Sequence, residues 1–138
     1  PGGDTEKLIA ALGLGELVQC YKGISHQEMV EKYADASIAV VPSLYEGFGL
    51  PAIEAMACGV PLVSSDGGAL AEVVEDAGLV VPAGDSQALA DAIRRLFEDD
   101  NLRTDVASRG LSRVEQHFCW NRCAERMEAY YRERIAAC

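Results

Sequence analysis

A short apolar run, a glycine loop and a strong helix former follow one another within residues 37–59, and this order constrains the fold most. The run Ser37–Val41 is long enough for a buried strand and too short for a helix. Pro51 stands where a first helical turn tolerates it, because its missing N–H would have no partner there. The helix expected over Ala52–Cys58 ends at Gly59, which favours a left-handed cap. A strand, loop and helix in this order aim backbone N–H groups at an anion.

Further apolar runs alternate with helical segments, and this alternation predicts the fold class. The four candidate strands are Leu17–Tyr21, Ile38–Val41, Pro61–Ser65 and Gly78–Val81. Apolar runs between helices are typical of parallel strands buried on both faces, so we expect an α/β fold: a Rossmann-like parallel sheet flanked by helices, with right-handed crossovers. Ligands of such sheets bind outside the carboxyl ends of the strands. The loops after Val41 and after Ser65 should therefore meet at one crevice.

The remaining pattern predicts helices of ordinary length. Ser25 and Glu28 form a capping box ahead of one helix, and Asp85 or Ser86 caps another, which Asp99 and Asp100 end. The last helix carries a stripe of large apolar side chains, which we expect to serve core or interdomain packing. These apolar positions are Trp120, Met127 and Tyr131.

Size, charge and cysteine content limit the class of protein. The 138 residues are expected to form a single domain, and the net charge of −10 argues against nucleic acid as a partner. No apolar stretch approaches the roughly 20 residues that a membrane span needs, and no signal peptide opens the chain. The five cysteines form no CxxC pair, which favours reduced thiols in a cytoplasmic protein. With only His26 and His117 besides, we expect no metal site.

The charges are unevenly spread along the chain. Residues 33–93 contain no lysine or arginine, although they contain nine acidic residues. Charge-assisted contacts to phosphate are about twice as strong as neutral ones. A phosphate bound at the glycine loop must therefore obtain its cationic side chains from outside this span.

The glycine loop also carries a specific motif. Glu46 and Glu54 are separated by seven residues, filled as Glu-Gly-Phe-Gly-Leu-Pro-Ala-Ile-Glu and followed by Ala-Met-Ala-Cys-Gly. This run resembles the nucleotide-sugar site of glycosyltransferase family 4, in the C-terminal, donor-binding domain of the GT-B fold. The likeness continues through residues 61–68 with Glu72, through residues 78–81, and through Phe118-Cys119-Trp120, where a small hydroxyl residue commonly stands in place of Cys119.

The resemblance implies a retaining enzyme that transfers a sugar from a nucleotide diphosphate sugar to an acceptor, with no cofactor and no obligatory metal. It implies that Glu54 binds the ribose hydroxyls and that Glu46, the candidate catalytic residue, lies near the donor sugar and the reacting carbon. The other candidate donor-binding residues lie in the two glycine loops. They are Ser43, Gly47, Phe48, Gly49, Leu50, Gly67 and Gly68.

These residues also have purely structural interpretations. Glu54 can complement the dipole of its helix, and Glu46 can be a solvated turn residue. Ser43 is better explained as a local hydrogen-bond partner of the turn than as a ligand contact. The glycines can serve tight turns, although a residue without Cβ also lets a phosphate or sugar approach the backbone closely.

The resembling domain has about six strands, whereas four are readable here. We therefore expect the chain to be truncated at its N-terminal side, without the acceptor-binding N-terminal domain and without the basic segment that approaches the diphosphate, and so to be inactive alone. Unpaired sheet edges favour association, so a homodimer or a strand-exchanged oligomer is a further hypothesis. The parent enzyme is expected to be cytoplasmic, with peripheral membrane association possible for it.

Two alternatives remain open at this point. A phosphorylase or a non-hydrolysing sugar-nucleotide epimerase of GT-B type would share the motif. A non-catalytic Rossmann-like binding module would leave the spacing of Glu46 and Glu54 as a coincidence.

Overall fold

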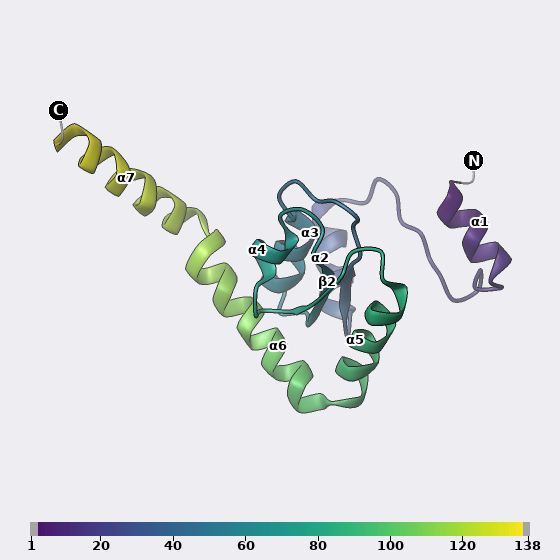
Figure 1. Cartoon of the computed structure of the whole chain (residues 1–138). Helices are drawn as coiled ribbons and strands as arrows, with labels where there is room; N and C mark the ends of the chain where they lie inside the picture. Colours follow the sequence, from purple (N-terminus) through teal and green to yellow (C-terminus); the bar gives the residue numbers. More distant parts are fainter. Residues whose placement is uncertain (1–2, 137–138) are drawn as a thin grey trace.

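A three-stranded parallel sheet lies at the centre of the computed structural model, which describes residues 3–136 (Figure 1). The strands lie in the order β1 (Ala39–Val41), β2 (Leu62–Ser65) and β3 (Leu79–Val81). All pairing is parallel, with Val40 opposite Val63 and Ser64 opposite Val80. The predicted α/β class with a parallel sheet is confirmed. Pro1 and Gly2, expected to end a connection, and Cys138 lie outside the described residues.

Helices cover both faces of the sheet. All four residues of the central strand β2 are therefore buried, and each of them is apolar or small, as a strand covered on both faces requires. Leu62 packs into a core formed with α3 (Leu50–Ala57) and α4 (Leu70–Val74). Val63, which points to the opposite face, packs into a second core with α5 (Ser86–Glu98) and α6 (Asp100–Arg113).

The helix caps predicted from the sequence are confirmed for α2 and α5. Ser25 and Glu28 form the reciprocal capping box of α2 (His26–Asp35). Hydrogen bonds from the backbone N–H and then from the hydroxyl of Ser25 lower the pKa of Glu28. Asp85 caps α5 by accepting from the amide of Ala88, and Asp99 both ends α5 and caps α6.

One of the four predicted strands, Leu17–Tyr21, is wrong. Leu17–Tyr21 is irregular and exposed, and it follows α1 (Asp4–Ala11) on a segment that lies apart from the sheet (Figure 1). A strand exists only where a neighbour pairs its backbone, and no other strand within residues 3–136 lies beside this run. The run therefore has the residue types that favour a strand, but it forms none because no strand of the described chain lies beside it.

The end of the chain was only partly predicted. A π-helical turn, η1 (Val114–Phe118), follows α6, and α7 (Trp120–Ala136) then extends away from the body (Figure 1). Cys119 has extended backbone angles between them and breaks the helix. Trp120 is 89% exposed and Tyr131 57%, so within the described residues the apolar stripe of α7 packs into no core. No helix in this part of the chain is both long and apolar enough to cross a membrane.

Candidate functional site

The loop between β1 and α3 presents unpaired backbone donors. Gly49 precedes the helix in the left-handed conformation, with φ of 83°, and a Cβ there would lie 3.2 Å from Leu70. Among residues 3–136, no acceptor receives a hydrogen bond from the amides of Gly47, Phe48, Gly49 or Leu50. These four donors therefore lie, without partners among the described residues, at the positive end of α3.

The second glycine loop packs directly against the first, as the strand order predicts. Glu46 and Gly68 form an isolated parallel bridge, and the amide of Ala69 donates to the carbonyl of Glu46 at 2.9 Å. The Ser65 hydroxyl donates to the carbonyl of Ser43 at 2.5 Å. A Cβ on Gly67 would lie 2.5 Å from that same carbonyl oxygen. The two turns thus form one rim at the carboxyl edge of the sheet.

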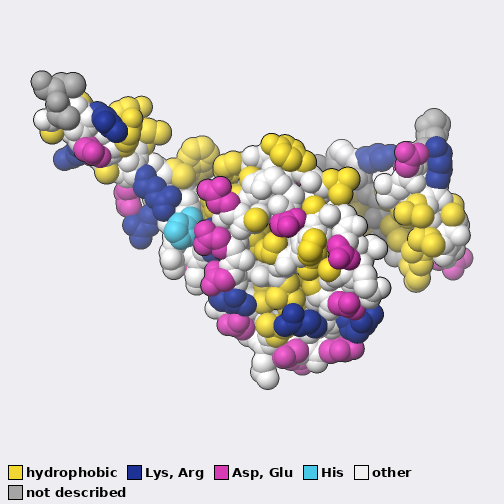
Figure 2. All heavy atoms as spheres, viewed as in Figure 1, with side chains coloured by type: hydrophobic (Ala, Val, Ile, Leu, Met, Phe, Trp, Pro, Cys, Tyr) yellow, Lys and Arg dark blue, Asp and Glu magenta, His cyan; other side chains and the backbone are white. Residues whose placement is uncertain are grey.

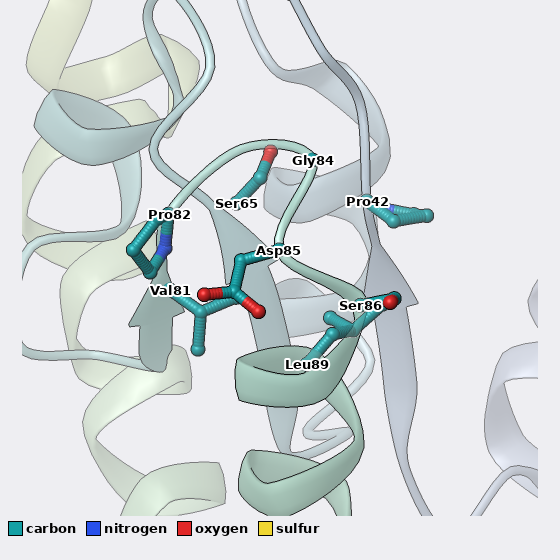
Figure 3. A pocket seen from close by; sticks show the side chains of 8 residues that line it. All are labelled: Pro42, Ser65, Val81, Pro82, Gly84, Asp85, Ser86 and Leu89. Carbon is teal, nitrogen blue, oxygen red and sulfur yellow. The ribbon is translucent and has the colours of Figure 1, made fainter.

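A third loop, after β3, completes this rim. The carboxylate of Asp66 accepts from the amide of Ala83 at 2.8 Å, and the amide of Asp66 donates to Val81. A small hollow of about 170 Å³ lies here, between the strand ends and the start of α5 (Figure 3). Asp85 and Ser86 line it, but Asp85 already caps α5. The sequence did not predict that this loop belongs to the rim.

Glu46 lies within the rim rather than in free solution. Its side chain is half-buried, and the Ser43 hydroxyl donates to its carboxylate at 3.3 Å. Its backbone joins the two glycine loops. Ser43 therefore makes the local hydrogen bond that was predicted for it. This bond orients the Glu46 carboxylate.

Glu54 lies in the second turn of α3, next to α2. Its side chain is half-buried, and the phenol of Tyr33 lies close to it while donating to the Pro51 carbonyl at 3.4 Å. Burial, and then the negative charge of Glu54, raise the pKa of Tyr33. Glu54 and Glu46 thus flank the start of α3, Glu54 on the side of α2 and Glu46 on the side of α4.

The Gly47–Phe48 corner opens into a hollow of about 430 Å³, here called the basic hollow. It lies between this loop, α4 and the break that leads into α7. The residues that matter for its charge and shape are Gly47, Phe48, Glu72, Arg113, His117 and Arg126. Sequence reasoning missed the three basic residues, which lie more than sixty positions beyond the loop. The sequence signal for two of them is that the chain after Ile93 contains arginines and no lysine.

Arg113 has a structural role in this wall. Its guanidinium donates to the carbonyls of Glu72 and Val73, at 2.6 and 2.5 Å, and pairs with the Glu75 carboxylate at 2.8 Å. These bonds satisfy the last carbonyls of α4. Arg113 therefore fixes the helix whose first residues contact Glu46.

Comparison with known proteins gives consistent results. The family described as "Glycosyl transferases group 1" matches residues 3–113. The chain is 43% identical to an MMP alpha-(1->4)-mannosyltransferase of Mycolicibacterium hassiacum, covering 100% of this chain and 35% of that protein. It superposes on a sucrose-phosphate synthase of Thermosynechococcus elongatus with a TM-score of 0.84 and 40% identity, over 97% of this chain and 34% of the other.

A third similar protein was solved with a nucleotide. Anabaena HepE in complex with UDP superposes with a TM-score of 0.78 and 28% identity, over 91% of this chain and 36% of that one. The chain spans about a third of the length of the curated relatives that it matches, with shares of 35%, 26% and 30% for the first three. The predicted family and fold class are confirmed.

Proposed function

The chain belongs to the glycosyl transferases group 1 family, and on this basis we propose that it binds the nucleotide diphosphate part of a sugar donor at the start of α3. One observation carries the proposal: the four amides of residues 47–50 have no acceptor within residues 3–136, and the loop that bears them borders a hollow. Unpaired donors at a helix N-terminus are the arrangement that binds phosphate groups.

The two carboxylates have separate roles in this proposal. Glu54 accepts hydrogen bonds from the ribose hydroxyls, and Glu46 lies on the side of the donor sugar and the reacting carbon. Ser43 holds the Glu46 carboxylate through its hydroxyl. Gly67 and Gly68 keep the second loop close enough for backbone contacts to the sugar. Transition-state charge on the departing diphosphate is then met by preorganised main-chain dipoles.

The activity of the whole protein is part of the same proposal. It transfers the donor sugar to an acceptor with retention at the anomeric carbon, and it needs no cofactor and no obligatory metal. The acceptor is bound by residues outside these 138, which span about a third of the relatives' length. Within residues 3–136, no strand pairs with the outer edge of β1, which favours a homodimer or a strand-exchanged oligomer of this chain.

Replacing Gly47 with valine tests the phosphate site. Gly47 lacks a positive φ, and a Cβ built on it meets nothing within 4 Å, so the protein itself has room for the side chain. A bound diphosphate would compete for that room. We expect the Gly47→Val protein to keep its melting temperature and to lose the stabilisation that UDP, GDP or ADP gives the unchanged chain in a thermal-shift assay. Equal stabilisation of both proteins by the best nucleotide would contradict the proposal.

A further inference from the structure

We propose that Arg126, with His117 beside it, supplies the cationic contact to the donor diphosphate that residues 33–93 lack. This inference rests on the proposed function, since it identifies further residues of the same site. Arg126 and His117 line the basic hollow together with Gly47 and Phe48, whose amides are unpaired within residues 3–136. In Figure 2, basic side chains gather beside a histidine where the projecting helix leaves the body.

Arg126 differs from the neighbouring arginines Arg113 and Arg122 in having no carboxylate partner among the described residues. Arg113 is committed to α4 and Glu75, and Arg122 is paired with Glu125 at 2.8 Å. Within residues 3–136, no carboxylate forms an ion pair with Arg126. Within the described residues, the hydrogen-bond partner of its guanidinium is the His117 ring, at 3.1 Å. Arg126 is therefore the cation of this hollow whose charge remains available to a ligand.

The contact with His117 also defines a second donor. A guanidinium can only donate, so Nδ1 of His117 accepts from Arg126 and the ring proton resides on Nε2. Within the described residues this Nε2–H has no acceptor, so it can donate to a phosphate oxygen. The loop that bears the amides of Gly47 and Phe48, the imidazole and the guanidinium thus bring several hydrogen-bond donors to one hollow, which suits an anion with several oxygens.

Two carboxylates line the hollow, those of Glu72 and Glu75. Glu75 is paired with Arg113, whereas no basic group within the described residues pairs with the Glu72 carboxylate, so Glu72 is the charge that opposes a phosphate most. Its backbone carbonyl is held by Arg113, so the side chain can be changed without loss of that bond. Removing this negative charge should strengthen binding of a phosphate, whereas removing the charge of Arg126 should weaken it. Neutral substitutions at Glu72 and at Arg126 should therefore change the affinity for a phosphate in opposite directions, although both residues line the same hollow.

The test is isothermal titration of the 138-residue chain with the nucleoside diphosphate that binds best, its nucleoside, and pyrophosphate. Arg126→Ala should weaken the diphosphate about 10- to 100-fold and leave the nucleoside unchanged. Arg126→Lys should restore part of the loss. Glu72→Gln should tighten the diphosphate by about two- to fivefold. The matched control is Arg132→Ala, which removes an arginine of α7 that is paired with Glu128 at 2.6 Å.

The outcomes separate this inference from the function on which it rests. If Glu54→Gln weakens the diphosphate while Arg126→Ala behaves like Arg132→Ala, the cationic role of Arg126 is wrong and the donor site stands. If the unchanged chain binds no nucleoside diphosphate, both are wrong. Equal losses for nucleoside and diphosphate in Arg126→Ala would also overturn the inference, because they would indicate a structural role.

Discussion

Replacing Gly68 with alanine is expected to destabilise the chain strongly and to abolish donor binding. Gly68 has φ of 64°, and a Cβ there would lie 2.9 Å from the backbone nitrogen of Glu46. Left-handed strain and overpacking against backbone together cost roughly 2–6 kcal/mol, which is a large share of the about 5–15 kcal/mol that stabilises a typical domain. In thermal unfolding followed by circular dichroism, the melting temperature should fall by roughly 10 °C or more.

Gly47→Ala is the matched control for this substitution. It places the same methyl group in the neighbouring loop, where nothing lies within 4 Å. Its effect on stability should stay within about 0.5 kcal/mol, as for a surface substitution. A Gly68→Ala protein as stable as Gly47→Ala would mean that the two loops are not packed together as described.

Replacing Glu54 with glutamine is expected to weaken nucleoside diphosphate binding about 10- to 100-fold without unfolding the chain. The carboxylate accepts from two ribose hydroxyls in the proposed complex, whereas an amide accepts with one neutral oxygen. Glu54 is half-buried and contributes no ion pair within residues 3–136, so its removal should cost little stability. Isothermal titration with UDP, GDP and ADP measures the loss.

A 2′-deoxy nucleoside diphosphate separates the ribose role from an indirect effect. In the unchanged chain the missing hydroxyl should weaken binding, and in Glu54→Gln it should cause little further loss, because the interacting pair is already broken. Tyr33→Phe is the control, since it keeps the Glu54 carboxylate and removes only the neighbouring phenolic hydroxyl. Additive losses from the deoxy ligand and from Glu54→Gln would contradict the ribose role.

Much of the fold was readable because its signals are local. The apolar runs at β1, β2 and β3, the capping box of α2 and the glycine that ends α3 all depend on a few adjacent residues. Leu17–Tyr21 has the same apolar character and still forms no strand. Pairing depends on what lies beside a segment, and β-propensity carries no information about that.

The two glycine loops of the site could be predicted from the sequence, but the basic hollow beside them could not. Parallel strand order brings the turns after β1 and β2 to one edge, so their convergence follows from the fold class. The basic hollow depends instead on η1 and on the break at Cys119, which turn the chain so that His117 and Arg126 come close to the Gly47 loop. Neither the π-helical turn nor the direction of α7 has a clear periodic signature.

The central claim is that main-chain donors at the start of α3 hold the diphosphate of the sugar donor. The most direct measurement is an amide chemical-shift titration of the ¹⁵N-labelled chain with the best-binding nucleoside diphosphate. The account predicts that the amides of Gly47, Phe48, Gly49 and Leu50 shift most and together, at ligand concentrations that match the calorimetric Kd. Saturable binding that leaves these four amides unmoved, with shifts confined to another surface such as the hollow in Figure 3, would contradict it.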